Sequence, residues 1–274
     1  MSQTEASPGI GVRHVEAGRG FAWWSESFAW LFGSLSHLGI WVAMGLCVMV
    51  ASIVLDHLAT LVLGQRWFAG SVAVTLLWFV LVGGAMAAAH KTAQGLPVRF
   101  GDFFAGFGTN AGPLLGVGLV VVAACAALVV LSYVVGVGAT LAGLSIDWSR
   151  PELTTGAIEA LLAIGGSLTL LLLIGLAMLV PLSLAVWLAP ALIVLRSAPP
   201  LQALRLSLSA CWRSLGALTL YSVSFFFLAA AATTLLFLGW FFLLPLMLLS
   251  TYSAYRDLFE AAGQDLDAQA PPQP

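Results

Sequence analysis

Two acidic positions are the best candidates for chemistry in this sequence: Asp56, which is followed by His57, and Glu159. A charged group deep in a bilayer is costly and usually serves proton or ion handling. However, Leu38–Leu55 already supplies about 18 apolar residues, nearly a full membrane crossing. We therefore expect Asp56 at the outer interface, paired with Arg66. If the helix instead continues to Leu63, Asp56 is submerged and a functional role is favoured.

Glu159 presents the same choice. It begins an apolar stretch on the expected outer side, where an acid at a helix N-terminus is electrostatically favourable. A carboxylate that couples transport to ion flow is the alternative interpretation.

Other catalytic or metal-binding patterns are missing. The sequence holds no H-E-x-x-H, no G-x-S-x-G and no phosphate-binding G-x-x-x-x-G-K-[ST]. Its four histidines and three cysteines are scattered, without the spacing of metal ligands or of a disulfide framework. Ser132, Tyr133, Ser167 and Thr169 are expected to form hydrogen bonds between helices. We therefore predict no catalytic residue, no cofactor and no metal site.

The elements that must position these residues are membrane helices. The chain has 274 residues, of which 61% are hydrophobic and 8% charged, whereas soluble domains carry about 25% charged residues. Three runs contain no charged side chain: 111–146, 160–195 and 214–255. A net charge of -2 argues against a nucleic-acid partner. Nine arginines against one lysine are typical of a GC-rich bacterial genome.

Length decides how the apolar runs divide. The 42 residues of 214–255 would make about 63 Å of helix, roughly twice a 30 Å hydrocarbon core, so they fit two crossings with a turn at 238–240. The 160–195 run fits one crossing to about Pro181, followed by a kinked apolar extension to Leu195. The predicted fold is all-α, with six transmembrane helices over about 37–58, 67–89, 113–137, 158–181, 215–237 and 240–257.

The positive charges support this count. With both termini in the cytoplasm, eight of the ten basic residues lie inside, and Arg66 and Arg150 lie outside. Such an excess of inner Arg and Lys is the usual determinant of orientation. We expect one integral membrane domain over 13–260, between disordered ends at 1–12 and 261–274.

A short amphipathic segment precedes each odd-numbered crossing, at 21–34, 99–110 and 201–214. Helices of this kind lie flat on the membrane surface. The pattern of interfacial helix plus helical hairpin therefore occurs three times, and a threefold repeat is one interpretation. Entry helices that any multi-pass protein needs are the other.

Charged residues gather on this cytoplasmic side. We call them the cytoplasmic collar: Glu26, Arg99, Asp102, Arg205, Arg213 and Arg256. They either orient the chain in the headgroup layer or clamp the interfacial helices together by ion pairs, and the arginines could also contact anionic lipid.

The segments RHVEAGRGFAWWSESFAWLF, FGDFFAGF, ALRLSLSACWRSLGALTLY and SAYRDLF carry a family resemblance. In order and spacing, the chain resembles uncharacterised multi-pass inner-membrane proteins of proteobacteria from Arg13 to Phe259. More remotely, it is similar to the membrane domain of some glycerophosphodiester phosphodiesterases, without their catalytic domain. The resemblance implies an inner-membrane location and about six helices, and it assigns no catalytic residue.

Three functions follow as hypotheses. The first is a non-enzymatic inner-membrane protein that binds membrane lipids or a membrane partner protein, or forms a homo-oligomer. The second is a small-molecule or lipid transporter, because prolines such as Pro181 and Pro245 interrupt helices as in many transport sites. The third is an intramembrane enzyme, which would need two reactive groups within hydrogen-bond reach.

Overall fold

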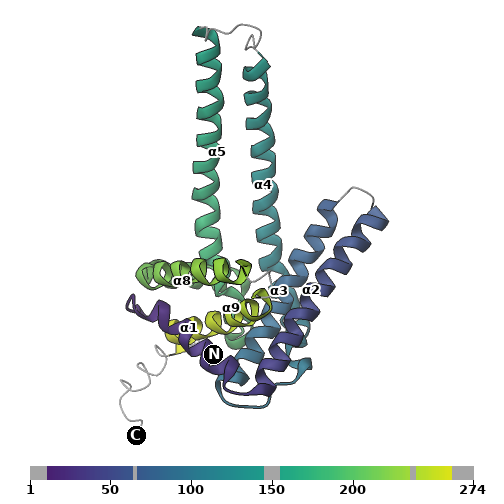
Figure 1. Ribbon diagram of the computed structural model, residues 1–274, viewed down its shortest axis with the longest axis vertical. Helices are drawn as coiled ribbons and strands as arrows, with labels where there is room; N and C mark the ends of the chain where they lie inside the picture. The colour runs from purple at the N-terminus through teal and green to yellow at the C-terminus, as the bar shows by residue number, and fades with distance from the viewer. Residues whose placement is uncertain (1–10, 64–66, 145–154, 235–238, 261–274) are drawn as a thin grey trace, which may run out of the picture. The chain divides into compact units, whose positions relative to one another are not determined.

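The computed structural model describes residues 11–63, 67–144, 155–234 and 239–260. Within these ranges the chain is all-α, with nine α-helices and two other helical turns (Figure 1). In chain order they are α1 (Arg19–Phe32), α2 (Leu35–Leu63), α3 (Trp67–Ala93), the 3-10 helix η1 (Phe100–Phe107), α4 (Ala111–Leu144), α5 (Thr155–Trp187), α6 (Ala189–Arg196), α7 (Pro200–Arg213), α8 (Leu215–Thr234), α9 (Trp240–Tyr255) and the π-helical turn η2 (Arg256–Glu260).

Among the described residues, five helical segments are long and apolar enough to cross a membrane, judged by length and composition. They are Leu35–Leu58, Gly70–Ala93, Ala111–Ala139, Thr155–Arg196 and Leu215–Thr234. α9 has 16 residues, fewer than the roughly 20 that a straight crossing needs. The multi-pass helical fold is therefore confirmed, while a sixth crossing stays a prediction.

The three amphipathic segments expected before the hairpins form α1, η1 and α7. The apolar run 160–195 behaves differently from the expected kink at Pro181. α5 continues through Pro181 to Trp187, and the helix breaks at Leu188. Pro190 lies in the first turn of α6, where a missing N–H costs nothing, so the next helix can begin there.

By their contacts, the residues form two compact units, one of 1–118 with 184–274 and one of 119–183. We call them unit 1 and unit 2. The prediction of a single membrane domain over 13–260 stays a prediction, and the disorder expected at the two ends falls mostly outside the described residues.

α9 is the centre of unit 1, because it packs against α1, α2, α3, α8 and η2. Most of its side chains are buried, including Tyr252 and Tyr255. In Figure 1, α8 and α9 run crosswise to the pair formed by α2 and α3. An aromatic core lies where α1 meets α8: Trp24 stacks on Tyr221 with ring centroids 4.8 Å apart, and Trp187 lies 5.2 Å from the same tyrosine.

Glycine allows η1 to lie directly on α3. A Cβ at Gly84 would clash with the Phe103 carbonyl, and one at Gly106 would clash with the Val80 carbonyl. This close approach buries Phe103 against Trp41, whose ring lies 4.9 Å away in an edge-on geometry. By contrast, a Cβ at Gly112 would meet open space.

Unit 2 consists of the parts of α4 and α5 within 119–183. Of its described side chains, only those of Ala157 and Ala160 are buried. Both helices are apolar on every side, which is the pattern of helices surrounded by lipid.

Candidate functional site

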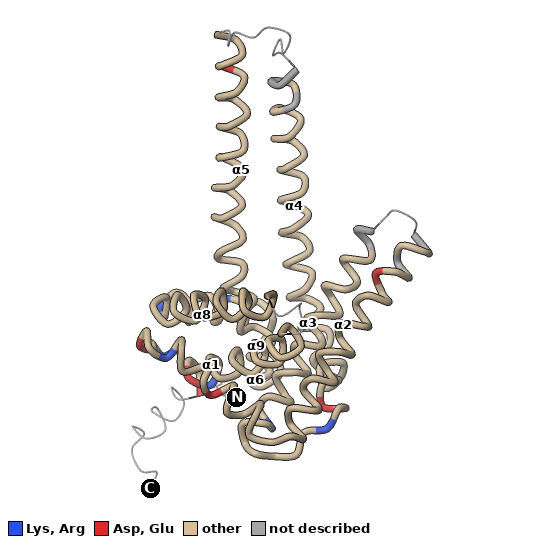
Figure 2. Tube along the Cα trace, in the orientation of Figure 1, with Lys and Arg blue, Asp and Glu red and all other residues tan. Residues whose placement is uncertain are grey.

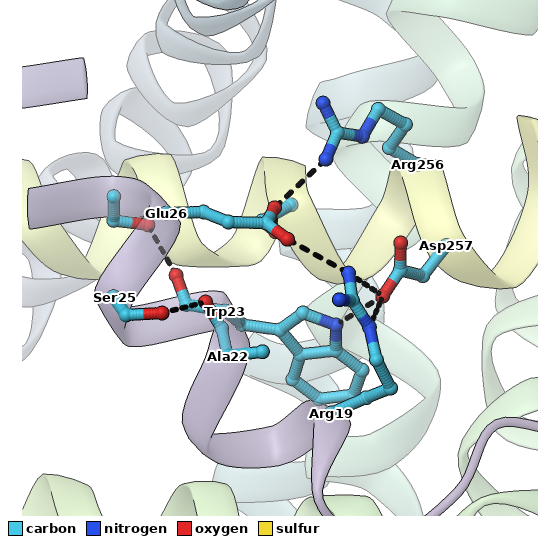
Figure 3. Close-up of polar contacts among 9 residues, drawn as sticks. Arg19, Ala22, Trp23, Ser25, Glu26, Arg256 and Asp257 are labelled. Carbon is cyan, nitrogen blue, oxygen red and sulfur yellow. Dashed lines mark hydrogen bonds and ion pairs between the residues drawn. The ribbon is translucent and has the colours of Figure 1, made fainter. Parts of the chain in front are cut away.

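Charged side chains from the two ends of the chain meet in one cluster (Figure 3). We call it the polar cluster, and it consists of Arg19, Trp23, Glu26, Ser253, Arg256 and Asp257. On α1, the spacings of 4 and 3 residues place Arg19, Trp23 and Glu26 on one helix face. The other three members lie on one face of the continuous helix formed by α9 and η2.

Each carboxylate of the polar cluster has several donors. Asp257 accepts hydrogen bonds from Arg19 Nε at 2.6 Å and from Trp23 Nε1 at 2.8 Å. Glu26 accepts from Arg19 Nη2 at 2.8 Å, from Ser253 Oγ at 2.6 Å and from Arg256 Nη2 at 2.8 Å. Two arginines thus balance two acids, and the cluster fastens α1 to the C-terminal helix.

The environment of Arg19 favours its charged form. Burial alone would lower the pKa of Arg19, but its hydrogen bonds and charge attraction to Asp257 and Glu26 outweigh burial and raise it. Arg256 also covers the ring of Trp30, with its guanidinium carbon 5.1 Å from the centroid. This arrangement suits a clamp, because every carboxylate is bound to cations within the protein.

A second ion pair connects η1 to α3. Lys91 Nζ lies 2.7 Å from Asp102 Oδ1, while Asp102 Oδ2 accepts the Arg99 amide at 2.8 Å. Burial alone would raise the pKa of Asp102, but these two donors and the nearby charges lower it below its usual value.

The N-terminal segment is tied to distant parts of unit 1. His14 Nδ1 lies 2.6 Å from the Arg213 carbonyl, and the Val15 amide donates to Ser214 Oγ at 3.3 Å. Beside it, a recess of about 490 Å³ is lined by Arg13, His14, Val15, Glu16, Arg19 and Asp257. Its two arginines and two acids balance, so the recess has no net charge to select an ionic ligand.

The structure divides the cytoplasmic collar into two groups. Glu26 is paired with Arg256, and Asp102 with Lys91. Arg99, Arg205 and Arg213 are exposed, and within the described part of the chain none of these three side chains takes part in an ion pair. The ion pairs therefore join α1 to η2 and η1 to α3; among the described residues they do not join the three interfacial segments to one another.

Cys211 on α7 is an inert thiol. It is fully buried, and its Sγ lies 3.5 Å from the Leu184 carbonyl. Burial raises the pKa of its thiol to about 12, although a hydrogen bond with Ser207 acts in the opposite direction.

Asp56 and His57 are exposed side chains near the end of α2. Figure 2 shows an acidic position, drawn red, on this part of the helix. The helix does run to Leu63, the condition under which Asp56 could be submerged. However, α2 begins at Leu35, and the 21 residues to Asp56 make about 32 Å of helix, enough to cross a 30 Å core. A position at the interface is thus still consistent with the helix. The expected partner Arg66 lies outside the described residues.

Glu159 is exposed on the second turn of α5, in unit 2. None of the three recesses described for this protein is lined by Asp56, His57, Glu159 or Pro181. Within the polar cluster, Glu26 and Arg256 were predicted as site residues from the sequence, and the other four members were not. Their periodic spacing on two helices was the available signal.

Comparison with known proteins supports the membrane assignment. Over 224 residues, the chain is 29% identical to a probable inner membrane protein of Burkholderia thailandensis, a match that covers 77% of this chain and 74% of that protein. No protein-family model matches the chain, and no solved structure matches it significantly. The remote resemblance to glycerophosphodiester phosphodiesterases gains no support. The chain is an integral, multi-pass protein of the inner membrane with a bacterial homologue.

Proposed function

We propose that this protein acts by binding rather than by catalysis, and that its cytoplasmic collar binds the headgroups of anionic membrane lipids. One observation carries the proposal. The two acids of the collar, Glu26 and Asp102, form ion pairs within the protein. Arg99, Arg205 and Arg213 are exposed cations. Exposed arginines beside a membrane attract anionic headgroups, at about 1 kcal/mol each. A membrane partner protein with an acidic surface would use the same cations.

The orientation required by this proposal is the six-crossing topology with both termini in the cytoplasm. The uncharged run 214–255 supports it, because Arg213 and Arg256 at its two ends then share one face. The order of a short helix followed by two longer ones, which occurs at α1, η1 and α7, supports a threefold repeat. α6 and the shortness of α9 are departures from that repeat.

Topology is tested with reporter fusions after Lys91, Arg150 and Arg213, which we expect to read inside, outside and inside. An outside signal at Arg213 would contradict six crossings and remove the basis for a cytoplasmic collar.

Lipid binding is tested by native mass spectrometry of the full chain, released from nanodiscs that contain equal amounts of phosphatidylglycerol and phosphatidylcholine. The wild type should retain phosphatidylglycerol preferentially. The triple variant R99Q/R205Q/R213Q should lose this preference, whereas the charge-preserving variant R99K/R205K/R213K should keep it. Equal retention of both lipids by the wild type would refute the proposal, and so would turnover of any added lipid.

A further inference from the structure

An apolar groove lies beside Arg99, on the side of unit 1 formed by α2, α3 and η1. We call it the phenylalanine groove, and its lining includes Val48, Ala51, Leu81, Phe100, Phe103 and Phe104. It has a volume of about 100 Å³, and no polar atom contributes to its exposed lining. A cavity lined only by apolar atoms is not filled by water. In a membrane protein, the abundant apolar molecules available to fill it are lipid chains.

The rings at this groove are arranged for contact with something outside the protein. Phe103 is buried against Trp41, but Phe100, Phe104 and Phe107 remain 42%, 45% and 47% exposed. Phe104 lies 5.8 Å from Phe100 and 6.0 Å from Phe107, measured between ring centroids. The three rings therefore form a continuous apolar wall along η1.

Charge is placed at one end of this wall. Arg99 directly precedes Phe100 and is exposed, with no ion pair to any described residue. The charge of Lys91 is balanced by Asp102 at 2.7 Å. The corner formed by these three residues therefore has a net charge of +1, next to an apolar groove.

The geometry points to a binding site for one anionic phospholipid of the inner leaflet, with an acyl chain in the phenylalanine groove and the phosphate at Arg99. This inference rests on the proposed function, because it assigns one of the collar cations to a defined lipid. The groove supplies the apolar contact, and Arg99 supplies the preference for a negative headgroup. Arg205 and Arg213 have no part in this site.

The site is tested with phosphatidylglycerol that carries a photoreactive diazirine on its acyl chain, added to the full chain in nanodiscs. We expect cross-links to concentrate on residues 44–51 and 100–107. Substitution R99Q should reduce their yield about five-fold, the effect of one interfacial arginine. Substitution A51F, which fills the groove, should reduce it at least as much.

Matched controls are R205Q, at an exposed collar arginine that is not among the residues lining the groove, and A127F, at an exposed alanine of unit 2. Neither should change the cross-links at residues 44–51 and 100–107. If A51F does not fold, F104A serves instead, because it removes an exposed ring of the wall and should also reduce the yield.

Unchanged yield in R99Q and in A51F or F104A would overturn the site. Equal yield from a zwitterionic diazirine phosphatidylcholine would also overturn it, as would full competition by a free fatty acid. Suppose instead that the groove variants have no effect while R205Q/R213Q lowers phosphatidylglycerol retention. That result would support lipid binding by the collar and contradict a binding site in the phenylalanine groove. If the wild type shows no preference for phosphatidylglycerol over phosphatidylcholine, both the collar proposal and the groove site are contradicted.

Discussion

In unit 1 the side chains of Trp23, Trp41 and Tyr255 are completely buried, whereas the buried side chains described in unit 2 belong to two alanines. Unit 1 pairs the charges of its polar cluster within the protein, while the described part of unit 2 carries a single charged residue, Glu159. Both regions contain long apolar helices. They differ in burial within the protein, because unit 1 buries large aromatic side chains and the described part of unit 2 buries two alanines.

Large-to-small substitutions should separate the two units most strongly. Trp23→Ala removes a fully buried ring and a hydrogen bond to Asp257, so we expect it to lower the free energy of unfolding by about 3–5 kcal/mol. Leu172→Ala, at a side chain that is 62% exposed in unit 2, should change it by less than about 0.5 kcal/mol. Thermal unfolding of the purified chain in detergent measures both. A comparable loss in Leu172→Ala would mean that protein rather than lipid covers this side chain.

Removing a carboxylate should also separate the two units. Glu26→Gln deprives Arg19 and Arg256 of their shared partner, and we expect a loss of about 1–2 kcal/mol because both arginines remain partly exposed. The matched substitution Glu159→Gln in unit 2 should be close to neutral. If Glu159→Gln proves the more damaging in the same unfolding assay, a functional or structural partner of Glu159 must exist.

Glycine-to-alanine substitutions in the two units should change the free energy of unfolding in opposite directions. Gly84→Ala places a methyl group against the η1 backbone, so overpacking should destabilise the protein by about 1–3 kcal/mol. Gly166→Ala, where a Cβ meets open space within α5, should stabilise it by up to about 1 kcal/mol through helix propensity. Thermal stabilities of the two variants decide this. A neutral Gly84→Ala would show that η1 does not lie tightly on α3.

The smallest effect concerns acid pH. Because the pKa of Asp102 is lowered in the folded state, its stabilising contribution is present above its unfolded pKa of about 4 and is lost as the pH falls through its lower folded value. The stability difference between wild type and Asp102→Asn should therefore be constant near neutral pH, at most about 1 kcal/mol, and should shrink below about pH 4. Denaturation followed across this range provides the measurement. A difference that grows on acidification would contradict the lowered pKa.

Much of the fold was predictable because it depends on local composition. Uncharged runs of 36 to 42 residues require helices, since a helix satisfies its own backbone hydrogen bonds in lipid. The short amphipathic segments were predictable for the same reason, because their periodicity is a property of neighbouring residues. The break at Leu188 was not, because a proline such as Pro181 is tolerated within a long apolar helix.

The sequence by itself determined that this is a multi-pass helical membrane protein with basic residues gathered beside its short amphipathic helices. The tertiary structure decided which charges find partners. Glu26 and Arg256 are 230 positions apart, and Arg19 and Asp257 are 238 apart, so no local pattern could pair them. The same holds for the groove beside Arg99, which exists only because Gly84 and Gly106 let η1 approach α3. Helices follow from short-range periodicity, whereas partners and cavities depend on how the helices pack.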